Sequence, residues 1–134
     1  MSKTIVPVST VPAAGPYSQA VVAGNLVFCS GQLPVVPHNG VVVRGDIRAA
    51  TAQALENLKA VLTEAGLDLS CVVKTTVYLT DLADFPGMNE VYGTYFPGDF
   101  PARTTVQVAG LPRGVPIEID AVAAIPFATV KEIS

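Results

Sequence analysis

The sequence is poor in charge, and this scarcity narrows the kinds of protein it can be. Only 14% of its 134 residues are charged, against about 25% in an average soluble domain. The eight Lys and Arg residues are scattered without a basic cluster, and the formal net charge is −3. Because surfaces that bind nucleic acid carry a concentrated basic footprint, the sequence disfavours nucleic acid as a partner.

Histidine and cysteine are also scarce, which removes several kinds of catalytic and metal site. The single histidine, His38, falls in an expected loop with no visible partner to orient it as a general base. Cys29 and Cys71 form no C-x-x-C motif and are interpreted as reduced core residues. No H-E-x-x-H motif or Cys/His cluster is present, so no metal site is expected.

Long apolar runs are absent, although half of the residues are hydrophobic. No run reaches the roughly 18 residues that a membrane helix needs, and residues 1–12 lack the apolar block of a secretory signal. Cytoplasmic location is therefore the expectation. The surplus of apolar residues needs a place, and burial between subunits is the favoured explanation.

The remaining patterns predict one α+β domain spanning residues 1–134. Residues 18–31 read as two strands around a two-residue turn at Gly24–Asn25. Further strands are expected at 41–43, 71–79, 102–108 and 117–125, and helices at 45–66 and 84–96.

The expected helix ends carry recognisable capping residues. Asp46 is predicted to cap the first helix and Gly66 to end it, whereas Asp84 would cap the second and Pro97 would stop it. Two helices can cover one face of the sheet. The strand at 71–79 alternates poorly between polar and apolar residues, so its other face is expected to be covered too, by a closed homo-oligomer.

The two C-terminal strands each carry a notable charge, Arg103 and Glu118. If these strands pair antiparallel, both side chains project from one surface of the sheet. One interpretation is an ordinary cross-strand ion pair or a solvated face. The other is an anion site, in which the guanidinium binds a carboxylate and the glutamate orients or deprotonates a water molecule.

Four other residues also have two readings. Ser30 and Gly31 could offer a hydroxyl and a backbone N–H to a ligand, or mark the end of a strand. Tyr17 could close a pocket, or be a half-buried aromatic. Asn89 is expected at the surface or as a local cap.

Motifs along nearly the whole chain resemble the RidA (YjgF) family. The resemblance spans about residues 5–125, and the motifs that carry it are, in order, "GPYSQAV", "GNLVFCSGQLP", "GDI", "NLKAVLTEAG", "VVKTTVYLTDLADFPGMNEVY", "YFPGDFPARTTVQVAGLP" and "IEIDAVA". The resemblance implies a chorismate-mutase-like (bacillus type) sheet with two helices packed on one face. It also implies a homotrimer with clefts between subunits.

The resemblance further implies a hydrolase for reactive enamines and imines. Such proteins convert 2-aminoacrylate/2-iminopropanoate and 2-iminobutanoate to 2-oxo acids and ammonia, without a metal or organic cofactor. By resemblance, Arg103 binds the substrate carboxylate and Glu118 positions the attacking water. The other implied substrate-binding residues are Tyr17, Ser30, Gly31, Asn89 and Thr105.

Thr105 departs from the family pattern, because many deaminase members have cysteine there. The family uses mainly backbone atoms at this position, so activity is expected to survive the change. Two alternatives stay open: a non-catalytic regulator that binds a 2-oxo acid or related metabolite, and an endoribonuclease or translation inhibitor.

Overall fold

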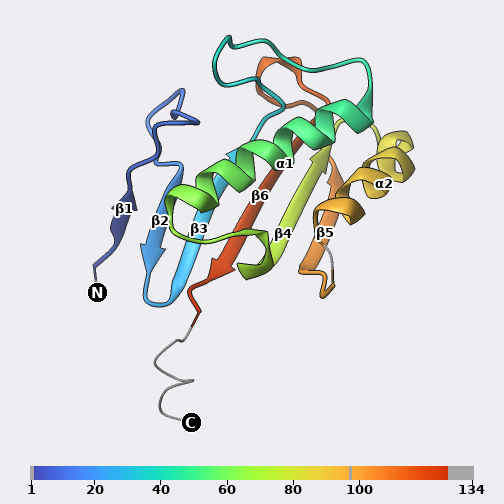
Figure 1. Ribbon diagram of the computed structural model, residues 1–134. Helices are drawn as coiled ribbons and strands as arrows, with labels where there is room; N and C mark the ends of the chain where they lie inside the picture. The colour runs from blue at the N-terminus through green and yellow to red at the C-terminus, as the bar shows by residue number, and fades with distance from the viewer. Residues whose placement is uncertain (1, 97, 127–134) are drawn as a thin grey trace.

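The computed structural model describes residues 2–96 and 98–126 as one six-stranded sheet with two helices on one face (Figure 1). The strands are β1 (Thr4–Val6), β2 (Ala20–Ala23), β3 (Leu26–Gln32), β4 (Val72–Leu79), β5 (Ala102–Gln107) and β6 (Ile117–Ala124). The helices are α1 (Ile47–Glu64) and α2 (Phe85–Tyr95), with short 3₁₀ turns at Leu69–Cys71, Leu82–Asp84 and Pro112–Gly114. The predicted α+β sheet with two helices is confirmed.

The strand order is β1-β2-β3-β6-β4-β5. All neighbours are antiparallel except β4 and β5, which are parallel. The connection from β4 to β5 contains α2, as a parallel crossover requires. In the described part of the chain, no helix has both the length and the hydrophobicity to cross a membrane.

The core lies between α1, α2 and one face of the sheet. Alternate residues of β6 are buried, and the apolar face of α1 packs onto them, with Leu55, Leu58 and Leu62 fully buried. Each such leucine stabilises the fold by about 1.5–3 kcal/mol through removal of its side chain from water. The period-2 pattern of the strand and the 3.6-residue period of the helix therefore build one core.

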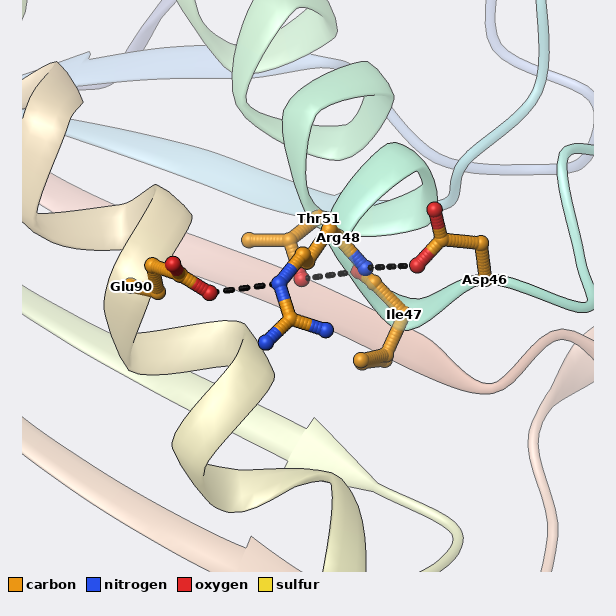
Figure 2. Close-up of polar contacts among 5 residues, drawn as sticks. All are labelled: Asp46, Ile47, Arg48, Thr51 and Glu90. Atoms are coloured by element: carbon orange, nitrogen blue, oxygen red, sulfur yellow. Dashed lines mark hydrogen bonds and ion pairs between the residues drawn. The ribbon is translucent and has the colours of Figure 1, made fainter.

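The ends of α1 follow the sequence prediction, and Figure 2 shows the first of them, at Asp46. The Asp46 carboxylate accepts a 3.0 Å hydrogen bond from the backbone N–H of Arg48, which satisfies one free donor at the helix start. Gly66 follows the helix at φ +78°, a conformation that residues with a Cβ adopt at a cost. Both predicted caps are confirmed.

The two helices approach closely where α2 begins. A Cβ on Gly87 would lie 2.7 Å from Cγ2 of Ile47, so only glycine fits this contact. Beside it, Arg48 Nε donates to Glu90 Oε2 at 2.5 Å (Figure 2). Both side chains of this ion pair are more than half exposed, so the pair contributes little to stability.

Three local predictions are wrong. A strand at residues 41–43 is replaced by a single isolated bridge between Val35 and Val42, and β1 was not expected. Asp84 makes no side-chain cap for α2 because it is already in helical geometry; Asp81 caps the preceding 3₁₀ turn instead. The proposed stop at Pro97 lies outside the described residues.

The face of the sheet without helices, called here the open face, mixes polar and apolar side chains. Ile5, Phe28 and Val106 are 48%, 46% and 37% exposed on it, and cross-strand register aligns Ile5 with Val21 and Val21 with Phe28. Such a row of exposed apolar side chains is unusual for a surface in water. Its coverage by further copies of the chain stays a prediction.

Candidate functional site

Arg103 extends from β5 over the aromatic side chains of α2. Its Cζ atom lies 4.8 Å from the ring centre of Tyr92 and 5.5 Å from that of Phe85, and Nη1 lies 4.0 Å from Sδ of Met88. Ring faces attract a guanidinium without using its N–H groups. No carboxylate of the described residues lies within 4.0 Å of Arg103, so its N–H groups can bind a carboxylate side by side.

The hydroxyl of Tyr92 fixes this support. It lies 2.7 Å from Oγ1 of the fully buried Thr75 on β4, and burial raises the pKa of Tyr92. Tyr92 is therefore a neutral, immobile ring beneath Arg103. The adjoining cavity, of about 410 Å³, is lined by Asn89, Tyr92, Gly93, Phe100, Pro101 and Arg103.

Glu118 lies in a second cavity, of about 470 Å³, at the open face. Its lining residues are Ala14, Tyr17, Ser30, Gly31, Leu33, Pro112, Arg113 and Glu118. The Glu118 carboxylate lies directly against the backbone of Gly31: a Cβ there would be only 1.8 Å from Oε2. Gly31 thus makes room for the carboxylate.

The surroundings of Glu118 disfavour its ionised form. Partial burial, and secondarily the negative charge of Asp120 two residues along β6, raise the pKa of Glu118. Asp120 is held by Tyr78, whose hydroxyl donates a 2.9 Å hydrogen bond to Oδ2. A raised pKa makes the Glu118 carboxylate a stronger base than an ordinary glutamate, which suits it to accept a proton.

Ser30 and Tyr17 border the Glu118 cavity with part of their hydrogen-bonding capacity already used. The Ser30 hydroxyl donates to the carbonyl oxygen of Ser18 at 2.6 Å, and its backbone N–H donates to the Gln19 carbonyl oxygen at 2.9 Å. The Tyr17 hydroxyl accepts from the N–H of Ala14 at 3.3 Å. Ser30 can therefore offer a ligand lone pairs, whereas Tyr17 keeps its proton to donate.

The expectation that Arg103 and Glu118 share one surface is wrong. On β4, Thr75 is opposite Arg103, whereas Tyr78 is opposite Glu118. Positions 75 and 78 are an odd number of residues apart and point to opposite faces. The expectation assumed that β5 pairs with β6, but β4 lies between them and is parallel to β5.

The predicted residues therefore fall into two groups. Tyr17, Ser30, Gly31 and Glu118 line one cavity, and Asn89 and Arg103 line the other. Thr105 lies opposite Val77 on the helix-covered side, and its Oγ1 is buried without a hydrogen-bond partner among the described residues.

The sequence reasoning missed the aromatic support of Arg103. Phe85, Met88 and Tyr92 are spaced by three and four residues, the period of one helix face. That spacing was a usable signal, but nothing in it indicated that the arginine would lie on this face. Among residues 2–96 and 98–126, no group of three or more His, Cys, Asp or Glu side chains is arranged to hold a metal ion.

The structure defines an α+β sheet protein with two small-ligand cavities: one holds a guanidinium with no carboxylate partner among the described residues, and the other holds a partly desolvated carboxylate. Comparison with known proteins gives the family. The chain belongs to the family described as Endoribonuclease L-PSP, whose pattern matches residues 8–125. The resemblance to RidA proteins is thereby confirmed.

Individual relatives cover almost the whole chain. The 2-iminobutanoate/2-iminopropanoate deaminase of Rattus norvegicus is 46% identical over 95% of this chain and 94% of its own length. A Yersinia pestis protein of the Rid family has a TM-score of 0.89 at 40% identity, covering 92% of this chain and 100% of its own. E. coli TdcF, solved with bound serine, has a TM-score of 0.85 at 41% identity, covering 92% of this chain and 99% of its own.

Proposed function

We propose that the protein hydrolyses reactive enamines and imines, namely 2-aminoacrylate/2-iminopropanoate and 2-iminobutanoate, to 2-oxo acids and ammonia. The observation that carries this proposal is the near full-length similarity to a protein named 2-iminobutanoate/2-iminopropanoate deaminase. The free guanidinium of Arg103 and the raised pKa of Glu118 fit the two tasks of that reaction. The proposal treats residues 1–134 as one cytoplasmic domain without metal or organic cofactor.

The reaction needs two copies of the chain, because Arg103 and Glu118 face opposite sides of the sheet. We therefore propose a closed homotrimer, in which each cleft combines the Arg103 cavity of one copy with the Glu118 cavity of a neighbour. The exposed side chains of Ile5, Phe28 and Val106 support this arrangement, because a second copy would remove them from water.

The chemistry requires mainly orientation of two reactants. The substrate carboxylate binds the guanidinium of Arg103, and the Glu118 carboxylate accepts a proton from a water molecule as that water attacks the imine carbon. From a protonated imine this addition gives a neutral carbinolamine, whose nitrogen then takes the proton from Glu118. The C–N bond breaks to release ammonia, while the hydroxyl oxygen forms the C=O bond and gives its own proton to the Glu118 carboxylate, which passes it to the departing ammonia. An imine is already electrophilic, so fixing it beside the water supplies most of the acceleration.

A non-catalytic role in metabolite binding is the second candidate. It is favoured by E. coli TdcF, which was solved with bound serine, a small molecule that carries a carboxylate. In this role the cavities would hold a 2-oxo acid or related metabolite and regulate another protein. Calorimetry that detects 2-oxobutanoate binding, together with no acceleration of imine decay, would support this alternative.

Ribonuclease activity is the less favoured function, although the family description contains that name. The net charge of −3 and the scattered basic residues do not suit the polyanionic backbone of RNA. We propose that nucleic acid is not a partner of the protein.

A coupled assay tests the enzyme proposal directly. Threonine dehydratase generates 2-iminobutanoate, and its decay is followed with the wild type, Arg103→Ala and a matched control, Arg48→Ala, whose guanidinium is exposed on α1. Arg103→Ala should lose about 1.5–3 kcal/mol of substrate binding, and Arg48→Ala should behave as wild type. Equal decay with and without wild-type protein would refute the proposal.

A further inference from the structure

A third charged side chain, Arg113, lines the Glu118 cavity. It also lines a smaller adjoining cavity, of about 130 Å³, that shares Ala14, Tyr17, Gly31 and Leu33 with the first. Arg113 therefore stands where the two hollows meet. Glu118 is the one carboxyl-bearing side chain among the residues that line the larger cavity with Arg113.

The backbone of Arg113 is held in an unfavourable conformation. Its φ of +60° and ψ of +16° make it the one non-glycine residue with positive φ in the described part of the chain. A residue with a Cβ pays a steric penalty there, and such penalties concentrate at binding sites. Glycine would adopt this turn without the steric penalty, so the presence of arginine indicates that its side chain has a role at the site.

The loop before α1 holds Arg113, in the turn before β6, at one end of the sheet. Its Nη2 donates to the carbonyl oxygen of Gly40 at 3.1 Å, and its own carbonyl oxygen accepts from Nη2 of Arg44 at 3.0 Å. Figure 1 shows the two segments side by side, the loop before α1 in teal and the turn before β6 in orange. Arg113 is thus braced before any ligand arrives.

Arg44 and Arg113 both lack an anionic partner among the described residues. No carboxylate of the described residues lies within 4.0 Å of Arg44 or Arg113, and Gly40 occupies only one of the five N–H groups of Arg113. Arg44 and Arg113 thus bring two positive charges to neighbouring segments of a chain whose net charge is −3. The surface around Arg44 and Arg113 therefore favours a ligand that carries a negatively charged group.

We propose that Arg113, braced by Arg44, recognises a second acidic group on the substrate, and that 2-imino acids with a side-chain carboxylate are preferred substrates. This inference rests on the proposed imine hydrolysis. Arg103 binds the carboxylate next to the imine carbon, which leaves Arg113 for the distal carboxylate. The reaction itself is unchanged: water replaces the imine nitrogen, which leaves as ammonia.

The test compares a neutral and an acidic side chain. Amino acid oxidases generate the imines of alanine, aspartate and glutamate, and semicarbazide trapping measures their decay. The variants are Arg113→Gly, which removes the guanidinium yet suits the positive φ, Arg113→Lys, which keeps the charge, and Arg48→Ala as a distant arginine control.

The expected result is a loss of activity that is confined to the acidic imines. Arg113→Gly should lower kcat/KM for the acidic imines about tenfold and leave the alanine imine within about twofold. Arg113→Lys should keep part of the preference, and Arg48→Ala should match wild type. An equal loss for all three imines, or no loss for the acidic ones, would overturn the role of Arg113.

Failure of the proposed function is recognised separately. If the wild type accelerates decay of no imine, the enzyme proposal fails, and the subsite is then judged by calorimetry with 2-oxobutanoate and 2-oxoglutarate. Tighter binding of 2-oxoglutarate that disappears in Arg113→Gly supports the subsite. Binding that is equal for both acids, or absent for both, overturns it.

Discussion

The two faces of the sheet differ in what they bury and in what they leave exposed. The helix-covered face closes an apolar core with α1 and α2, and Arg103 lies at its edge on aromatic rings. The open face leaves Phe28 and Val106 exposed beside the carboxylates of Glu118 and Asp120. The apolar core is complete within a single chain, whereas the catalytic cleft, as we propose, forms only where the open face of one copy meets the Arg103 cavity of another.

Two glutamates express the same contrast. Glu64, at the end of α1, accepts hydrogen bonds from the hydroxyl and N–H groups of Thr10 and Ser9, which lower its pKa to about 2. Glu118 has no such donors among the described residues, and partial burial and Asp120 raise its pKa. The Glu64 carboxylate, which stabilises the fold, has hydrogen-bond donors for its negative charge. The Glu118 carboxylate, which we propose transfers a proton, has none among the described residues.

The sharpest test separates the two faces by mutation. Glu118→Gln should lower the rate about 10²–10⁴-fold by removing the base, and Arg103→Ala should lose the carboxylate anchor. If a site combines the faces of two copies, co-refolding the variants in equal amounts should restore about a quarter of the sites, because each cleft needs one intact partner of each kind.

The measurement is imine decay by the two variants alone, mixed without refolding, and refolded together. The unrefolded mixture is the control, since it prevents subunit exchange. Absence of any recovery after co-refolding would contradict a site shared between copies.

A smaller loss is expected from closing the space beside Glu118. Gly31→Ala places a Cβ 1.8 Å from the present position of Glu118 Oε2, so the carboxylate must move. A displacement of about 1 Å can cost about 100-fold in rate. Gly110→Ala is the matched control, because a Cβ at Gly110 meets no atom within 4 Å. Steady-state kinetics would show the loss; wild-type kinetics in Gly31→Ala would refute the importance of this close contact.

Assembly should depend on the open face. Phe28 and Leu82 are both 46% exposed, but only Phe28 lies on the open face of the sheet. Phe28→Asp should lose about 1.5–3 kcal/mol of burial per copy and reduce the assembled mass in light scattering, whereas Leu82→Asp should not. The reverse pattern would place the contact surface elsewhere.

The smallest effect concerns stability and pH. The raised pKa of Glu118 means that the folded chain holds this proton more tightly than the unfolded chain, so stability falls as pH rises from the ordinary value of 4.5 to the raised one. Glu118→Gln should remove that decline and be slightly more stable than wild type near pH 7, with no difference below about pH 4.

Glu64→Gln should give the opposite sign. The lowered pKa of Glu64 stabilises the fold above the ordinary value of 4.5, and this contribution is lost as pH falls toward about 2. The variant should therefore be less stable than wild type near pH 7 and equal to it near pH 2. Urea unfolding at equal protein concentrations measures both variants, since assembly makes stability concentration-dependent. If the stabilities of Glu118→Gln and Glu64→Gln changed with pH in the same direction relative to wild type, the proposed difference between the two glutamates would be wrong.

Much of the fold was predictable because local patterns agree with the tertiary structure. The hairpin around Gly24–Asn25 and the α1 caps at Asp46 and Gly66 are decided by neighbours in sequence. Predictions failed where an element depends on pairing with residues distant in the sequence. β1 is only three residues long and forms by pairing with β2, so its own sequence carried little signal.

The chain sequence by itself determined both helices, five of the six strands, the family and the residues suited to bind an anion. Only the tertiary structure decided which of those residues meet. Because β5 adds to β4 in parallel instead of pairing with β6, Arg103 turns toward the rings of α2 while Glu118 turns to the open face. Alternation along a strand sets the face of a side chain relative to its neighbours, but pairing between distant strands sets which face that is.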